Sequence, residues 1–222
     1  MNQALAQWNI HSYSECGESA LILYFSGQNL RDQNRNVSSL CKVLSTNKPE
    51  WLRDLVPGFD SLMLVYDIAS LDLYGVLGWL AKLRHSEDIA YEGKLYHIEV
   101  DYRLSSAFDL NNVSDELALS VEDVIDLHQR QQLRVFAIGF TPHFAYLGEL
   151  PEQLKVARLS KPRVAVPAGA VAIADNYSAV YPASSPGGWQ LLGTVTDLNA
   201  FLAIDLSVGD RIQFKTHSIT RS

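Results

Sequence analysis

Glycine and proline recur between short apolar runs from residue 139 to residue 193, and this pattern constrains the fold more than any other feature of the sequence. Glycine tolerates a positive φ, whereas proline holds φ at about −65°, so together they fix tight turns between short strands. The pattern occupies residues 139–148, 161–174 and 181–189. It predicts strands that bend sharply around a compact core, as in a small closed β structure.

The turn residues of these segments are expected to shape loops, because other side chains would strain the backbone there. They are Pro142, Pro167, Gly169, Pro186, Gly187 and Gly188. Aromatic residues are interleaved with the turns, namely Phe140, Phe144, Tyr146, Tyr177, Tyr181 and Trp189. Aromatic rings on rigid turns commonly line a concave pocket, but they also fill barrel cores, and the residue types leave both interpretations open.

Length and composition favour two domains. At 222 residues the chain exceeds the most common domain size of roughly 100 to 150 residues, and with 47% hydrophobic and 19% charged residues it can bury a sizeable core. We predict an α+β fold, with an N-terminal open α/β sandwich over residues 1–92 and a domain of mainly β structure over residues 93–222.

The first half alternates strands with helices. Residues 20–25 are almost continuously apolar, as in a strand buried on both faces. Ser26 is expected to cap a helix that continues to about residue 45, and Ser70 to cap a second helix. Further strands are predicted at residues 8–13, 61–66 and 95–101.

The second half begins with a helical pattern between residues 105 and 132. Ser120 opens a capping box there, and the apolar face that follows includes Val124 and His128. Beyond this point no long helical pattern occurs. The predicted strands are residues 133–138, 164–166, 171–174, 189–192 and 211–216.

Charge and composition exclude several classes of function. The formal net charge of −7 disfavours nucleic acid, because phosphate binding needs clustered Lys and Arg. Cys16 and Cys41 suggest neither a disulfide framework nor a cysteine-rich metal site, and the six histidines lack metal-ligand spacing. No apolar run approaches the roughly 20 residues of a spanning helix, and no signal peptide is evident, so we expect no membrane partner and a cytoplasmic location.

Two further features leave alternatives open. Between residues 109 and 126 there are six carboxylates without Lys or Arg, a pattern that indicates either a docking surface or a solvated acidic face. His143 is the histidine of the Gly/Pro-rich region, and it is either a functional group or a surface residue. The sequence contains no phosphate loop, dinucleotide fingerprint, His-Glu-x-x-His or Gly-x-Ser-x-Gly motif, so the motifs assign no catalytic residue.

A set of segments nonetheless follows a family pattern. They are residues 17–23, 56–57, 61–67, 96–102, 119–128, 139–148, 162–163, 166–174, 181–182 and 185–189. In order and residue type they resemble the signature of the 5-oxoprolinase B-subunit family. That family is also called allophanate hydrolase subunit 1 or carboxyltransferase subdomain C/D, and it includes the Kip inhibitor of a sporulation histidine kinase.

The resemblance implies that the C-terminal domain is a cyclophilin-like β-barrel. It also implies a larger cyclophilin-like partner, of the 5-oxoprolinase C-subunit or allophanate hydrolase subunit 2 type, together with the A-type component of 5-oxoprolinase. Such a complex opens 5-oxoproline to glutamate at the expense of ATP, so ATP binding and activity belong to the assembly and the ligand is a small carboxylate or amide. Fused relatives form the carboxyl-transfer domain of urea carboxylase.

The chain departs from the family pattern at three places. His143 replaces a glycine, residues 157–159 (Ala-Arg-Leu) replace Pro-Arg-Arg, and residues 177–179 (Tyr-Ser-Ala) replace Gln-Thr-Gly. Replacing glycine by histidine narrows any space that the backbone lined, and tyrosine exchanges an amide for a bulkier phenol. The predicted pocket therefore differs from that of the family, which leaves the standard 5-oxoproline reaction open.

Arg158 and Arg163 lie in a basic stretch, residues 155–163, that contains no acidic residue. A guanidinium can hold a carboxylate by two parallel hydrogen bonds, so such a ligand needs an anchor of this kind. We expect Arg163, which matches the family's Pro-Arg, to face the cleft and Arg158 to lie at its rim. The predicted substrate-binding residues are Phe140, His143, Tyr146, Arg158, Arg163, Tyr177, Ser178, Tyr181 and Trp189.

Three functions are compatible with the sequence. The first is a subunit of an ATP-dependent 5-oxoprolinase complex, or a relative that acts on another small amide or carboxylate. The second is a regulatory protein that inhibits a sensor histidine kinase, and the third is a domain that has kept only the fold. A cognate partner subunit would favour the first function, and a blocked pocket without such a partner would favour the second.

Overall fold

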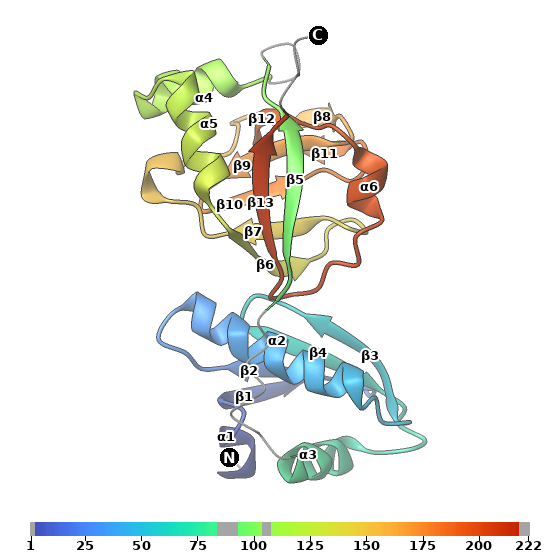
Figure 1. Cartoon of the computed structure of the whole chain (residues 1–222). Coiled ribbons are helices and arrows are strands. Elements are labelled where there is room, and N and C mark those ends of the chain that lie inside the picture. The colour runs from blue at the N-terminus through green and yellow to red at the C-terminus, as the bar shows by residue number, and fades with distance from the viewer. Residues whose placement is uncertain (1–2, 84–92, 104–107, 218–222) are drawn as a thin grey trace. The chain divides into compact units, whose positions relative to one another are not determined.

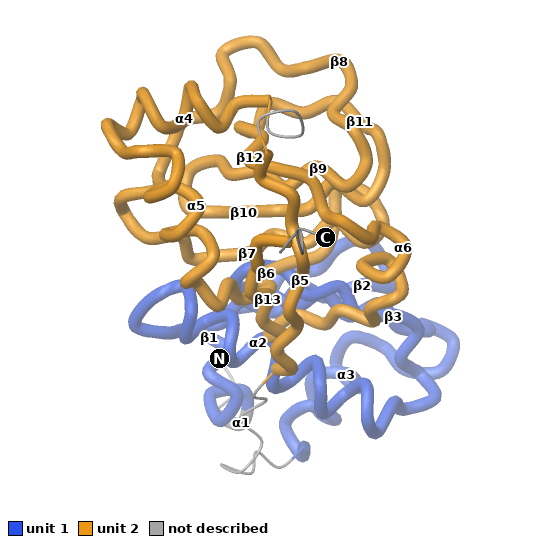
Figure 2. Tube along the Cα trace, turned by 45° about the horizontal axis from the view of Figure 1, so that its top comes forward, with its two compact units in different colours: residues 1–92 blue, residues 93–222 orange. Residues whose placement is uncertain are grey.

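The computed structural model describes residues 3–83, 93–103 and 108–217. The chain folds into two compact units, unit 1 (Met1–Glu92) and unit 2 (Gly93–Ser222). Figure 2 colours the two units. The predicted α+β class is confirmed, because helices and an antiparallel sheet make up unit 1 and a closed barrel forms the centre of unit 2.

Unit 1 is a four-stranded antiparallel sheet in the order β1-β2-β4-β3, with α2 crossing one face (Figure 1). Its strands are β1 (Ile10–Glu15), β2 (Ala20–Phe25), β3 (Leu52–Pro57) and β4 (Ser61–Tyr66), and its helices are α1 (Gln3–Ala6), α2 (Leu30–Thr46) and α3 (Leu73–Lys82). One hydrophobic core joins the sheet to α2 and α3. The apolar run of β2 predicted a strand buried on both faces. On the face opposite the core, however, Ile22 and Tyr24 are only half-buried, so helices of this unit cover one face of β2.

Both predicted helix caps in unit 1 are wrong by two or three residues. Asn29 caps α2, its side-chain oxygen accepting the N–H of Asp32 at 2.9 Å, and Asp72 caps α3 by accepting the N–H of Gly75 at 2.8 Å. The residue directly before the first helical turn reaches these free N–H groups, whereas Ser26 and Ser70 lie too far upstream. The sequence pattern does not predict strand β3, because its charged residues hide the alternation of an edge strand.

Unit 2 is a closed barrel in the order β10-β7-β6-β13-β5-β12-β9, with β9 and β10 completing the closure. Its strands are β5 (Leu95–Asp101), β6 (Leu133–Ile138), β7 (Ala145–Gly148), β9 (Ala170–Ala174), β10 (Tyr177–Val180), β12 (Gln190–Val195) and β13 (Arg211–Thr216). Neighbouring strands pair antiparallel except β5 and β13, which run parallel. A separate two-stranded sheet consists of β8 (Arg163–Val166) and β11 (Ser185–Gly187).

Short helices cover the barrel: α4 (Leu110–Leu117) and α5 (Val121–Arg130) lie on one side of β5 and β13, and α6 (Leu198–Leu202) lies on the other (Figure 1). A 3₁₀ turn, Glu152–Leu154, follows β7. Ser120 caps α5 as predicted, its hydroxyl oxygen accepting the N–H of Asp123 at 3.0 Å. Val124 and His128 are buried against the barrel, as the amphipathic pattern predicted.

Candidate functional site

A cavity of about 260 Å³ lies among the Gly/Pro-rich segments of unit 2. Residues from β7, β11 and the turns around 140, 160 and 189 surround it, so the three segments that dominate the sequence meet at one place. The lining residues are Phe140, Phe144, Tyr146, Arg158, Pro162, Tyr181, Pro186, Gly187, Gly188 and Trp189.

Phe144 is the centre of the aromatic wall. Its ring contacts those of Phe140, Tyr146, Tyr181 and Trp189 at centroid distances of 5.4, 5.1, 5.3 and 5.9 Å, all edge to face. Such contacts fix the ring orientations, because the positive edge of one ring meets the negative face of another. Phe144, Tyr181 and Trp189 are buried, whereas Phe140 is 64% exposed. The aromatic wall of the cavity therefore combines buried rings with an exposed one.

The turn before β7 separates Phe140 from His143. Both residues have a positive φ, +74° and +65°, and the turn closes through a hydrogen bond from the Gly139 N–H to the Phe144 carbonyl at 3.0 Å. His143 is exposed and is not among the residues that line the cavity, so the structure does not bring it together with the other predicted site residues there. The left-handed backbone explains why the family pattern has glycine at this position, since a positive φ is unusual for any other residue.

At Gly187 the backbone lies close to the side chain of Tyr181. A Cβ atom at this position would overlap the Tyr181 hydroxyl, so only glycine fits without moving the ring. At Gly188 the nearest atom to such a Cβ would be 3.6 Å away, an ordinary contact distance. Burial raises the pKa of Tyr181, and a hydrogen bond with the Trp189 backbone offsets part of this rise. Tyr181 therefore stays protonated at neutral pH.

Among the lining residues, Arg158 carries the positive charge. Its guanidinium carbon lies 5.9 Å from the centre of the Trp189 ring, and its Nε lies 3.6 Å from Asp175 Oδ2. The side chain is 61% exposed, so this ion pair is a weak, solvent-screened one. Arg158 is thus held over an aromatic face with donors left for an anion.

Arg163 has the opposite role to the predicted one. Its Nη2 lies 2.5 Å from Asp109 Oδ1, and its Nη1 donates to the Trp189 carbonyl at 3.3 Å. The buried Asp109 carboxylate also accepts the N–H of Leu191 at 2.7 Å. Arg163 therefore ties β8 to β12 and to the start of α4, and it does not line the cavity. Sequence position could not reveal this, because Asp109 lies 54 residues away.

Ser178 is also outside the cavity. It is buried in the barrel, with its Oγ 2.9 Å from Nε2 of His128, while Nδ1 of His128 lies 2.8 Å from the Tyr102 hydroxyl. The imidazole stacks on Phe214 at 4.8 Å. Burial lowers the pKa of His128 to about 3, so the ring is neutral and donates at one nitrogen while accepting at the other. Every ring nitrogen has a partner, which makes this cluster a structural one.

The remaining predicted residues lie on turns and strands around the cavity. Tyr177 packs edge to face on Phe136 at 6.2 Å and does not line the cavity. Pro186 lines it, Pro142 is exposed in the turn before β7, and Gly169 has a φ of +83° in the turn before β9, close to Pro167. Phe144, one of the interleaved aromatic residues of the sequence but not one of the predicted substrate-binding residues, lines the cavity, and so does Pro162, which the predicted set does not include.

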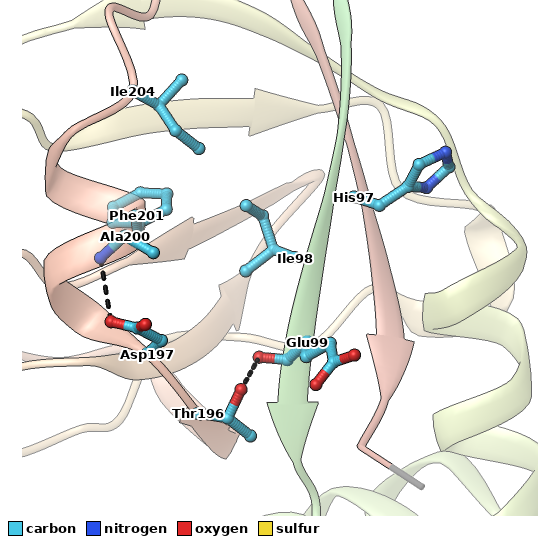
Figure 3. A pocket seen from close by; sticks show the side chains of 8 residues that line it. All are labelled: His97, Ile98, Glu99, Thr196, Asp197, Ala200, Phe201 and Ile204. Atoms are coloured by element: carbon cyan, nitrogen blue, oxygen red, sulfur yellow. Dashed lines mark hydrogen bonds between the residues drawn. The ribbon is translucent and has the colours of Figure 1, made fainter.

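A second cavity, of about 230 Å³, lies between β5 and α6 (Figure 3). Ile98, Phe201 and Ile204 form its apolar part, and His97 points away from α6. Its carboxylates are already engaged: Asp197 accepts the N–H of Ala200 at 2.9 Å, and Glu99 lies 2.8 Å from His217 Nδ1. The Arg158 cavity is the better candidate site, because its guanidinium keeps free donors.

The described residues offer neither a metal centre nor a membrane span. No group of three or more His, Cys, Asp or Glu side chains among them is placed to hold a metal ion. No helix in the same part of the chain is long and apolar enough to cross a membrane.

Known proteins are similar to this chain in sequence and in fold. Residues 11–203 match the family described as carboxyltransferase domain, subdomain C and D. The 5-oxoprolinase B subunit of Escherichia coli O157:H7 is 35% identical over 167 residues, which cover 72% of this chain and 76% of the relative, and that of Bacillus subtilis is 29% identical over 196 residues, covering 82% and 81%. The crystal structure of TTHA0988 superposes with a TM-score of 0.78 at 34% identity over 93% of this chain, which spans only 40% of that longer protein.

Proposed function

Because the chain belongs to the family of carboxyltransferase subdomains C and D, we propose that it is a subunit of an ATP-dependent 5-oxoprolinase-type complex. The complex would open 5-oxoproline to glutamate or act on a similar small amide or carboxylate. Support comes from relatives that are named as the B subunit of 5-oxoprolinase and share 29% to 37% of their residues with this chain. The name of these relatives, a B subunit, also supports partner subunits, and the family resemblance suggests that they are of the A and C types.

The Arg158 cavity is the observation that carries this proposal. Its volume of about 260 Å³ suits a ligand of one small ring, since cavities for drug-sized ligands measure roughly 300 to 1,000 Å³. Arg158 would hold the ligand carboxylate by charge-assisted hydrogen bonds, and the rings of Tyr146 and Trp189 would pack against its flat amide ring. A small cyclic carboxylate matches both the polar and the apolar part of the site.

Tyr181 would orient the amide. Since its raised pKa keeps it protonated, its hydroxyl can donate to the ligand carbonyl oxygen, where negative charge develops when the amide is attacked. Among the residues that the structure describes, the cavity lining contains no carboxylate, histidine or serine that could act as base or nucleophile. We therefore assign binding and orientation to this chain, and the chemical step to the assembled complex.

ATP does not fit this cavity. A triphosphate needs several cationic or backbone N–H donors, often from a glycine-rich loop at a helix N-terminus, whereas the lining offers the single guanidinium of Arg158. We place ATP on the partner subunits. Inhibition of a sensor histidine kinase stays a prediction from the family resemblance, and no contact described above favours it.

The proposal is tested by calorimetric titration of 5-oxoproline into the chain with its partner subunits. We expect Arg158→Gln to weaken binding at least about tenfold, because the anchor for the carboxylate is lost. Arg130→Gln is the matched control, since Arg130 is an exposed arginine on α5 whose ion pair with Asp126 lies outside the cavity. Equal affinities of wild type and Arg158→Gln would remove the cavity from the proposal.

A further inference from the structure

The Arg158 cavity holds little charge. Among the residues that the structure describes, its lining has one cationic side chain, that of Arg158, and no carboxylate. The other polar side-chain groups of the lining are the hydroxyls of Tyr146 and Tyr181 and the indole N–H of Trp189, all of them neutral. Rings, prolines and glycines make up the rest. A ligand therefore finds one charged partner for one carboxylate, and any further carboxylate meets neutral or apolar groups.

A second guanidinium near the wall is already neutralised. Burial raises the pKa of Tyr181, and the charges of Arg158 and Arg163 oppose that rise, so both cations act on this hydroxyl. Arg163, however, is paired with Asp109, whose side chain is only 4% exposed. Because this pair has no net charge, Arg163 does not replace the missing partner of a second carboxylate.

Opening the ring of 5-oxoproline changes the charges that the site must hold. Water adds across the amide: the bond between the ring nitrogen and the carbonyl carbon breaks, the carbon gains an oxygen, and the nitrogen becomes a protonated amine, while ATP hydrolysis on the partner subunits supplies the energy. The substrate has one carboxylate, whereas glutamate has two carboxylates and an ammonium group. An ammonium group can rest against the face of an aromatic ring. A carboxylate is repelled by that face, and it loses hydration without a cation in return.

We propose that the Arg158 cavity is selective for a single carboxylate, so that it holds the closed ring and releases the opened product. The inference rests on the proposed function, which supplies the substrate and the product. With the first carboxylate at Arg158 and the amide carbonyl at the Tyr181 hydroxyl, the second carboxylate forms beside Tyr181. This side chain is 1% exposed, and that of Trp189 is 6% exposed, so the new charge arises against a buried part of the wall. The product thereby weakens its own binding, and the cavity is vacated for the next substrate.

Calorimetric titration of three ligands into the chain with its partner subunits, without ATP, tests the inference. The ligands are 5-oxoproline, glutamine and glutamate. Glutamine and glutamate have nearly the same shape and differ in the charge of the terminal group. We expect the Kd of glutamate to be at least about tenfold above those of both 5-oxoproline and glutamine, because glutamate alone brings a second carboxylate.

A variant that supplies the missing cation sharpens the test. Phe140 lines the cavity and is 64% exposed, so a lysine there can keep its stem at the wall and its ammonium group hydrated. We expect Phe140→Lys to lower the Kd of glutamate at least about fivefold relative to that of glutamine, with a melting temperature near that of wild type. Tyr74→Lys is the matched control, because Tyr74 is a 78% exposed aromatic residue in unit 1, and it is expected to leave the ratio of the two Kd values unchanged.

The outcomes separate the two proposals. If wild type does not bind 5-oxoproline, the proposed function is wrong and the selectivity with it. If wild type binds 5-oxoproline and glutamate equally tightly, the selectivity is wrong while the proposed function stands. Glutamine that binds as weakly as glutamate would show that shape excludes the product, and equal effects of Phe140→Lys and Tyr74→Lys would show an effect of net charge; either result overturns the inference. Should Phe140→Lys fail to fold, the affinities of wild type for glutamine and glutamate decide.

Discussion

In the cavity of unit 2, Arg158 lines the wall together with five aromatic residues, and most of its side chain is exposed to solvent. In the barrel of the same unit, aromatic rings surround His128, which is fully buried with a hydrogen-bond partner at each nitrogen. The two regions use similar side chains, yet only the first has donors left for a ligand. The difference shows that an aromatic setting alone does not identify a site, whereas a polar group with free donors at an opening does.

Arg158 and Arg163 show the same difference between an exposed group and a group held by buried contacts. Arg158 lines the cavity, whereas Arg163, five positions later, is bound to the buried Asp109. The buried polar contacts hold unit 2 together, and the exposed arginine is available for binding. Substitutions in the buried polar contacts are therefore expected to lower stability, whereas substitutions at the cavity are expected to lower ligand affinity.

The largest effect is expected for Asp109→Ala. It leaves the partly buried Arg163 without its partner and the Leu191 N–H without an acceptor, so we expect a loss of about 3 kcal/mol in the free energy of unfolding. Urea titration measures this loss. Asp126→Ala, which breaks an exposed pair with Arg130, serves as control and is expected to cost less than about 0.5 kcal/mol. Equal losses would show that the Asp109 contact is no stronger than a surface ion pair.

A pH titration tests the barrel interior. The folded-state pKa of His128, about 3, lies below the ordinary value of 6.5. Between these two pH values the histidine is protonated in the unfolded chain but neutral in the folded chain. The stability from the neutral ring is complete above pH 6.5 and is lost as the pH falls toward 3. Between pH 7 and 5, wild type is expected to lose about 2 kcal/mol more than His128→Gln. Parallel pH profiles of the two proteins would contradict the assignment.

A smaller effect distinguishes two neighbouring glycines at the cavity. Gly187→Ala would push a methyl group into the Tyr181 hydroxyl, and we expect a loss of about 1.5 kcal/mol in stability together with weaker 5-oxoproline binding. Gly188→Ala meets only ordinary contacts and is expected to change stability by less than about 0.5 kcal/mol. Thermal unfolding and calorimetric titration measure both quantities. If Gly188→Ala is the more damaging variant, the position of the Tyr181 ring is wrong.

Much of the fold could be read from the sequence, because local patterns report local structure. Strands β4, β5 and β13 have the predicted bounds, and Ser120 caps α5 as expected. Strands β7 and β10 have no counterpart among the predicted strands. Of the predicted site residues, Tyr146 and Arg158 line the cavity, whereas His143 and Ser178 do not, and their part in ligand binding stays a prediction.

By itself, the sequence determined the closed β structure, the segments that would meet around a cavity, and the family pattern, because turns and apolar periodicity act between neighbours in the chain. Only the tertiary structure decided which arginine keeps exposed donors at the cavity. Arg163 pairs with Asp109, 54 residues away, and Ser178 bonds to His128, 50 residues away. These contacts occupy the side chains of Arg163 and Ser178, and no local sequence pattern predicts them. A polar group stays available for a ligand when the fold leaves it exposed with donors unused, and that depends on how distant segments pack.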